Sequence, residues 1–174
     1  MRHAILITAY TDFIQLINLV KMFDYRFDIY IHIDKKANIS DTYFNLLRSL
    51  PHVKVVDCIY TVNWGGRNHI DAILWLCREA LNNSQDVSFF HLISGSDLLV
   101  KSIDSFCSFF ENHKEDNFLD YFLLPNIRWE GGGLNRLEFN YPMDRINIKT
   151  YKGYSIYCRF LNWQIKNGYR SEEQ

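Results

Sequence analysis

The chain has 174 residues, which fits a single domain, and 48% of them are hydrophobic, which is enough for a sizeable buried core. The formal net charge of −1 gives no overall field that attracts nucleic acid, so any anionic ligand has to be bound by local geometry. The four cysteines are scattered and include no C-x-x-C pair, which argues against a zinc knuckle, a thioredoxin-type motif or a compact disulfide framework.

The N-terminus leads directly into an apolar, strand-like segment, residues 4–7, without an extended hydrophobic leader. No stretch of the chain approaches the roughly 18 consecutive apolar residues of a membrane span. The sequence therefore predicts a cytoplasmic protein. Peripheral attachment at the inner face of the membrane is the alternative interpretation.

Apolar strands alternate with amphipathic helices along most of the chain. The predicted strands are residues 3–9, 27–33, 53–58, 88–93 and 117–124. Helices are predicted after the first four strands, with N-caps at Thr11 or Asp12, at Ser40, near Asn68 and at Ser102. A last helix is predicted over about residues 155–166.

The apolar stripes of two helices predict which side chains face the sheet. The helix near residue 70 is expected to turn inward Ile70, Ile73, Leu74, Cys77 and Leu81. The helix that begins at Ser102 is expected to turn inward Ile103, Phe106, Phe109 and Phe110.

This alternation predicts an α/β fold with a mostly parallel sheet and helices on both faces. Ligands of such sheets bind at the carboxyl ends of the strands, where Asp34, the turn at 64–66 and the turn at 94–97 are expected to lie. The composition changes after Pro125. We therefore expect an α/β domain over residues 1–125, followed by a region of different character over residues 126–174.

Several motifs of other enzyme classes are absent from the sequence. It contains no P-loop, and no G-x-G-x-x-G follows the first strand, which weakens the kinase, NTPase and dinucleotide-binding interpretations. No H-E-x-x-H and no Asp-x-Asp is present to hold a metal ion, and no G-x-S-x-G elbow indicates a hydrolase.

Three short segments can each carry chemistry, and each also has a purely structural interpretation. Asp34 can accept a hydrogen bond from a base or ribose, or it can cap a turn. The turn at 64–66 (WGG) can form a wall against a ring, or it can be a buried Trp beside a flexible turn. The turn at 94–97 (SGSD) lets backbone approach a ligand and offers hydroxyls for sugar binding, or it is an ordinary capped strand-to-helix turn.

Together and in this order, these segments resemble the core-2/I-branching β-1,6-N-acetylglucosaminyltransferase family, which also contains the peptide O-xylosyltransferases. The segments are residues 29–36 (IYIHIDKK), 64–66 (WGG) and 91–97 (HLISGSD). The resemblance covers about residues 2–125, and it implies a nucleotide-sugar-binding domain over residues 1–125, followed by an incomplete acceptor-side region over residues 126–174. It implies a GT-A-type, Rossmann-like fold and inverting transfer of a sugar from a UDP-sugar to an acceptor hydroxyl, without a metal ion or other cofactor.

Carried over position by position, the resemblance places Ala9 and Tyr10 near the nucleotide and Asp34 at the uracil or ribose. The other residues that it implies around the cleft are Trp64, Gly65, Gly66, Ser94, Gly95, Ser96 and Asp97. Arg136 and Tyr141 belong to the acceptor side in the same comparison.

The resemblance provides no catalytic base. Family members take a carboxylate base, and the basic residues that bind the diphosphate, from a C-terminal half that has no counterpart here. Glu130 and Glu138 are the nearby carboxylates, and a solvated loop position is the alternative interpretation of each. The sequence therefore predicts a chain that is truncated at the C-terminus relative to a complete enzyme.

Three functional hypotheses follow. The first is a glycosyltransferase with UDP-N-acetylglucosamine or UDP-xylose as donor and a glycan or surface polysaccharide precursor as acceptor. The second is a non-catalytic remnant that at most binds a UDP-sugar. The third is an unrelated nucleotide-binding α/β domain that shares only the carboxylates at the strand ends.

Overall fold

The structure, a computed structural model, describes residues 1–84 and 86–168. The strands are β1 (Arg2–Ala9), β2 (Phe27–Ile33), β3 (Val53–Asp57) and β4 (Val87–Ser94). The helices are α1 (Phe13–Val20), α2 (Asp41–Ser49), α3 (Asn68–Asn83), α4 (Ile103–Glu111), the short 3₁₀ helix η1 (Glu130–Gly133), α5 (Asn135–Glu138) and α6 (Tyr151–Lys166).

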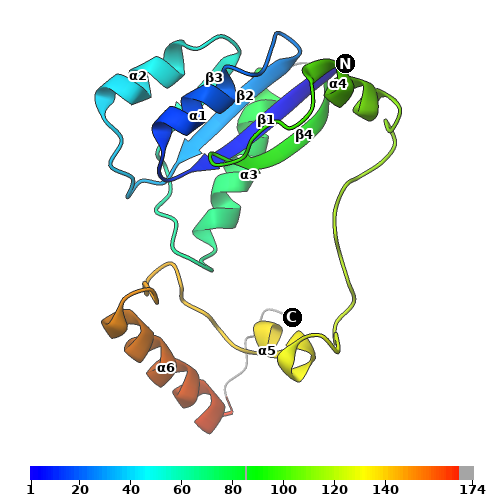
Figure 1. The fold of residues 1–174 in the computed structure, drawn as a ribbon. Coiled ribbons are helices and arrows are strands. Elements are labelled where there is room, and N and C mark those ends of the chain that lie inside the picture. The colour runs from blue at the N-terminus through cyan, green and yellow to red at the C-terminus, as the bar shows by residue number, and fades with distance from the viewer. Residues whose placement is uncertain (85, 169–174) are drawn as a thin grey trace. The chain divides into compact units, whose positions relative to one another are not determined.

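The four strands form one parallel sheet in the order β3-β2-β1-β4 (Figure 1). At its carboxyl end β1 pairs Ala9 with Ile33 of β2 and Thr8 with Ser94 of β4. The predicted α/β class with a parallel sheet is therefore confirmed. The same register brings the carboxyl ends of β1, β2 and β4 together at one edge of the sheet.

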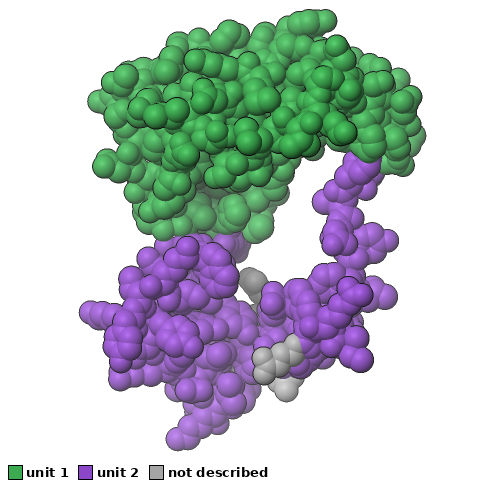
Figure 2. Space-filling model, in the orientation of Figure 1, with its two compact units in different colours: residues 1–62, 68–116 green, residues 63–67, 117–174 purple. Residues whose placement is uncertain are grey.

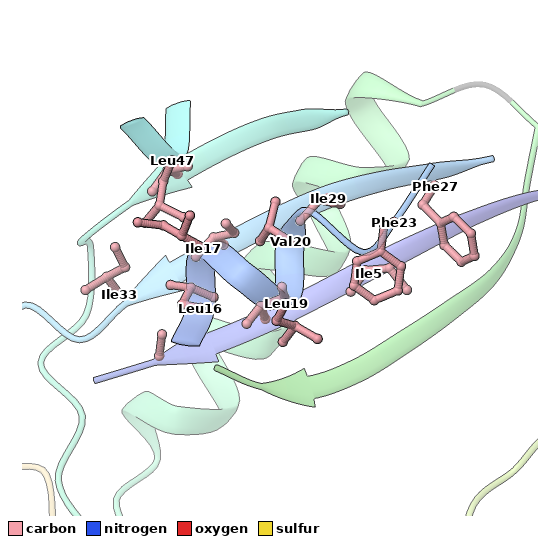
Figure 3. Packing of buried hydrophobic residues seen from close by; sticks show 14 of the residues in the cluster. Ile5, Leu16, Ile17, Leu19, Val20, Phe23, Phe27, Ile29, Ile33 and Leu47 are labelled. Carbon is pink, nitrogen blue, oxygen red and sulfur yellow. The ribbon is translucent and has the colours of Figure 1, made fainter. Parts of the chain in front are cut away.

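Helices cover both faces of the sheet, as predicted. On one face α1, α2 and α4 pack against β1 and β2, with Leu16, Leu47 and Cys107 among the buried side chains. Figure 3 shows the side chains of α1 in this layer. On the opposite face α3 packs Leu76 against the side of the sheet that carries Tyr30. This layering is consistent with a GT-A-like fold.

Three of the predicted helix caps are confirmed. Asp12, Ser40 and Ser102 each precede a helix, and each side chain accepts a hydrogen bond from a backbone N–H in the first turn. These bonds satisfy donors that have no partner within the helix, which explains why the helices begin where they do.

The predicted fifth strand is wrong, because residues 117–124 form no strand. Their aromatic and apolar composition satisfies the pattern of a strand, but a strand also needs a neighbour that takes its backbone hydrogen bonds. Within the described residues this segment pairs with no strand. Leu119, Tyr121 and Leu123 are correspondingly exposed.

The predicted inward face of α3 is wrong in part: Cys77 packs against the core, but the fully buried positions are others. Ala72, Leu76 and Ala80 are buried, whereas Ile70 and Leu81 are exposed. Residues at this four-residue spacing form one face of a helix, and two alanines on that face let the helix approach the sheet closely. The prediction gave the two alanines no weight and therefore also missed Leu76, which lies between them on the same face.

In α4 and α6, only some of the apolar residues on the predicted stripe are at least partly buried. Ile103, Phe106 and Phe110 of α4 pack as predicted, but Phe109 is exposed. Helix α6 begins at Tyr151, four residues before the predicted start, because Thr150 caps it by accepting a hydrogen bond from Gly153 N. Its apolar residues Ile156, Trp163 and Ile165 are largely exposed.

The chain divides into two compact units (Figure 2). The first consists of residues 1–62 and 68–116, and it contains the whole sheet and helices α1 to α4. The second consists of residues 63–67 and 117–174. The expected domain boundary after residue 125 stays a prediction.

Two histidines of the first unit form a pair between β1, β4 and α4, and of these His3 is buried and His91 is half-buried. The Nδ1 atom of His3 lies 2.9 Å from Nε2 of His91, so one ring donates a hydrogen bond and the other accepts it. The rings of Phe89, Phe106 and Phe110 surround the pair. Burial in this aromatic layer lowers the pKa of both histidines, that of His91 to about 4. The pair is therefore neutral at neutral pH.

We predict that the free energy of unfolding falls as the pH is lowered from 6.5 toward 4, by about 3 kcal/mol for His91. The unfolded chain takes up a proton near pH 6.5, whereas the folded chain does so only near pH 4. Above pH 6.5 both states are neutral and this dependence disappears. Urea denaturation at a series of pH values measures the effect.

In the His91→Phe variant, the free energy of unfolding is expected to fall less steeply between pH 6.5 and 4. This expectation does not depend on the variant's stability at neutral pH. His113→Phe removes a histidine outside the pair and serves as the control. An unchanged slope in the His91 variant would show that other groups dominate the acid response.

Candidate functional site

A pocket of about 210 Å³ lies at the carboxyl ends of β1, β2 and β4, entirely within the first unit. Its lining residues are Thr8, Ala9, Tyr10, Thr11, His32, Asp34, Val62, His69, Ser94, Gly95 and Ser96. The structure thus brings together six of the residues singled out from the sequence: Ala9, Tyr10, Asp34, Ser94, Gly95 and Ser96. This edge is where parallel α/β sheets bind ligands.

Asp34 is the carboxylate in the wall of this pocket, and it is only 6% exposed. Its Oδ1 atom accepts hydrogen bonds from the backbone N–H groups of Lys36 at 2.9 Å and Val62 at 3.2 Å. Its own backbone N–H donates to the carbonyl of Ala9 at 2.8 Å. Asp34 therefore fixes the shape of the pocket through Oδ1. Its other oxygen, Oδ2, accepts no backbone hydrogen bond and lies 3.8 Å from Lys36 Nζ.

The turn at Ser94–Asp97 forms the opposite wall. The N–H of Gly95 donates to the carbonyl of Thr8 at 2.9 Å, which continues the pairing of β4 with β1 beyond the strand. A Cβ atom at Gly95 would lie 2.9 Å from the Cβ of Ala9, so glycine is required by this close approach.

Asp97 turns back onto its own turn and does not line the pocket. Its Oδ2 atom accepts a hydrogen bond from the backbone N–H of Ser94 at 2.7 Å. The carboxylate therefore stabilises the turn, which agrees with the structural interpretation of this residue. Its placement around the cleft by resemblance stays a prediction that nothing in this geometry supports.

Five lining residues were not predicted from the sequence, and His32 is the most informative of them. It is buried in β2, two residues before Asp34, and strand alternation places these two positions on the same side. Its Nε2 atom accepts a hydrogen bond from the N–H of Tyr60 at 3.0 Å, so the ring proton is on Nδ1. Burial lowers the pKa of His32, against the opposing charges of Asp34 and Asp57. A neutral imidazole donor therefore lines the pocket.

The turn that contains Trp64, Gly65 and Gly66 belongs to the second unit and does not line the pocket. Within that unit the side chain of Asn63 donates hydrogen bonds to the carbonyls of Met143 and Asp144. A side chain at Gly66 would overlap the Asp144 carboxylate, which explains this glycine. Trp64 itself is exposed.

Arg136 and Tyr141 also lie in the second unit. The guanidinium of Arg136 is 3.8 Å from the ring centroid of Trp129, a cation–π contact, and the Tyr141 hydroxyl donates to the carbonyl of Asn135. Both contacts are structural, and an acceptor-side role for these residues stays a prediction. Glu138 lies in the same unit, and the side chain of Glu130 is outside the described residues.

Two further searches covered residues 1–84 and 86–168. In that part of the chain no three His, Cys, Asp or Glu side chains are grouped so that they could hold a metal ion. None of the helices there combines the length and apolar character that crossing a membrane requires.

The family model for Core-2/I-Branching enzymes matches residues 4–154, which is most of the chain and includes the whole pocket. The chain belongs to the Core-2/I-Branching enzyme family. No significant match was found among the curated proteins.

Membership of the Core-2/I-Branching family assigns the chain to the glycosyltransferases. The pocket at the carboxyl edge of the sheet lies within the part of the chain that the family match covers. Both units contribute to the matched region, since it extends into helix α6.

Gly95→Ala is expected to lower the free energy of unfolding by about 1–3 kcal/mol, because the new Cβ overpacks against Ala9. Urea denaturation of the two single variants and of the double variant with Ala9→Gly measures the coupling between these positions. The substitution at Gly95 should be less costly once the Cβ of Ala9 has been removed. Ser96→Ala, at an exposed position of the same turn, should change stability by less than about 0.5 kcal/mol.

Proposed function

We propose that the chain binds a UDP-sugar in the pocket at the carboxyl edge of the sheet and that the sugar is N-acetylglucosamine or xylose. In the complete reaction this sugar passes, with inversion and without a metal ion, to a hydroxyl of a glycan or other acceptor. A surface polysaccharide precursor and a site at the inner face of the membrane belong to the same proposal.

The observation that carries the proposal is the position of Asp34 in the pocket. One oxygen of its carboxylate is used to shape the pocket, and the other is suited to accept a hydrogen bond from ribose or uracil. The hydroxyls of Ser94 and Ser96 and the neutral ring of His32 supply further polar groups for a sugar or a base.

The size of the pocket fits part of such a donor. Its volume of about 210 Å³ is below the roughly 300–1,000 Å³ of pockets that enclose a whole drug-sized ligand. No lysine or arginine is among the described residues that line it. These properties suit the nucleoside portion of a UDP-sugar, whereas the diphosphate needs cations from another part of the protein.

Inverting transfer needs a group that takes a proton. The acceptor hydroxyl attacks the anomeric carbon, the bond from that carbon to the UDP oxygen breaks, and a base receives the hydroxyl proton. Departing UDP carries the electron pair of the broken bond and is stabilised by cations or hydrogen-bond donors. The absence of an Asp-x-Asp supports assigning this role to protein groups rather than to a metal ion.

One observation favours a second candidate function, a non-catalytic protein that only binds a UDP-sugar. Among the described lining residues, Asp34 is the sole carboxylate, and it already accepts two backbone hydrogen bonds. No second carboxylate in the described lining could take the proton of an acceptor hydroxyl. The two candidates differ in one measurement, which is sugar transfer to acceptor glycans followed by mass spectrometry.

We predict that the chain binds UDP and UDP-N-acetylglucosamine in EDTA, and that Asp34→Asn weakens binding at least about tenfold. Asparagine keeps an oxygen for the N–H groups of Lys36 and Val62 but loses the charge that strengthens a hydrogen bond from ligand. Isothermal titration calorimetry of the whole chain measures both affinities.

Asp41→Asn is the matched control, because it changes an exposed carboxylate in the first turn of α2 that does not line the pocket. Its affinity for UDP should stay within about twofold of the original chain. If the folded original chain binds neither ligand, the proposed donor site is wrong. If Asp34→Asn binds normally, the site stands and the role given to Asp34 is wrong.

A further inference from the structure

A second cavity lies in the first unit, between α1, β4 and the loop that joins β4 to α4. Its volume is about 230 Å³. The inner wall consists of Ile5, Leu19 and Phe23, which are 1%, 1% and 8% exposed. Figure 3 shows these three side chains in the core layer beside β1. The cavity therefore extends into the apolar core from the surface of the loop.

The wall of this cavity is aromatic as well as apolar. Phe23 and Phe106 contribute two phenyl rings, and His91 contributes a third ring. The Nε2 atom of His91 is already hydrogen-bonded to His3, and the ring is neutral at neutral pH. An aromatic guest would meet ring faces and edges here, an arrangement that stabilises aromatic pairs beyond the burial of their area.

Asp97 and Lys101 both line the cavity, and their side chains carry opposite charges. Oδ2 of Asp97 accepts from the N–H of Ser94, and the backbone carbonyl of Asp97 accepts from the side chain of Gln15 at 3.3 Å. The lining therefore has no net formal charge, and its inner wall of Ile5, Leu19 and Phe23 offers a charged guest no counter-charge. The cavity favours an uncharged guest.

The loop at the rim has apolar side chains that water now contacts. Leu98 is 62% exposed and Val100 is 87% exposed, although both belong to residues that line the cavity. A guest that fills the cavity would cover part of these side chains and gain free energy from their burial.

We propose that this cavity binds a small uncharged aromatic molecule of one or two fused rings, and that its occupancy is transmitted to the pocket that contains Asp34. A protein cavity of about 150 Å³ lined by Leu, Ile and Phe binds benzene, so the larger volume here suits a bicyclic ring such as indole. The binding part of this inference does not depend on the proposed function of the first pocket.

The link between the two sites is the turn at Ser94–Asp97. Asp97 lines the cavity, whereas Ser94, Gly95 and Ser96 line the first pocket. The hydrogen bond of 2.7 Å from the N–H of Ser94 to the Asp97 carboxylate connects the lining of the first pocket directly with the lining of the cavity. A guest that shifts Asp97 consequently shifts the backbone that forms the wall of the first pocket.

The test is a titration of the ¹⁵N-labelled whole chain with indole, followed by amide chemical shifts. We expect saturable shifts at Leu99 and Lys101 and, through the shared turn, at Ser94 and Gly95. Intermolecular NOEs between indole protons and the methyl groups of Leu19 locate the ligand. Octanoate, an apolar chain with a charged head, should cause no saturable shifts at these amides.

Leu99→Trp is designed to fill the cavity and should weaken indole binding at least tenfold. Ile14→Trp places the same ring on the exposed side of α1, outside the cavity, and should leave binding unchanged. If Leu99→Trp does not fold, the NOEs in the original chain decide the location.

Three results would overturn the proposal. The first is no binding of indole up to its solubility limit. The second is binding with NOEs only to residues outside the cavity. The third is displacement of indole from the cavity by octanoate. Binding in the cavity with no shift at Ser94 or Gly95 would refute the transmission to the first pocket.

Discussion

Strand β1 forms backbone hydrogen bonds along both of its edges and packs against helices on both of its faces. The carbonyls of its last two residues, Thr8 and Ala9, then bind the N–H groups of Gly95 and Asp34. Both walls of the candidate site are therefore attached to one buried strand. Because the interior around β1 is closely packed, the distance between these walls is set by the core rather than by the loops.

The division of the chain bears on how such an enzyme works. The pocket lies within the first unit, whereas Trp64, Arg136 and Tyr141 lie in the second. Under the proposed function, the nucleoside portion of the donor binds to the first unit, whereas the diphosphate and the proton transfer require groups that the described pocket lining does not provide. Asp34 illustrates the difference, since one oxygen of its carboxylate accepts hydrogen bonds from two backbone N–H groups that shape the pocket.

Much of the fold could be predicted from the sequence because strand composition, helix caps and the alternation of elements are local signals. Asp12, Ser40 and Ser102 act through neighbouring backbone, and they were identified correctly. The fifth strand could not be decided from local signals, because a strand also needs a partner. Residues 117–124 have the composition of a strand but pair with no strand in the described structure.

The same distinction applies to the candidate site. Asp34 and the turn at 94–97 follow apolar strands, so their place at the edge of the sheet could be inferred. His32 could have been found by counting two residues back from Asp34 along the strand. The Asp97 carboxylate accepts from the N–H of Ser94, three residues earlier, which is the capped-turn alternative that the sequence left open. The hydrogen bonds of Asn63 to Met143 and Asp144 join segments about 80 residues apart, and no sequence pattern encodes them.

Strand β4 has a further consequence for handling the protein. Within the described residues its outer edge pairs with no strand, and Phe90 and Leu92 are exposed on one face. The strand sequence, VSFFHLIS, contains no lysine, glutamate or proline of the kind that blocks edge-to-edge association. Self-association through this edge should therefore rise with concentration, and a charged residue in place of Leu92 is the rational first step toward a sample that stays dispersed.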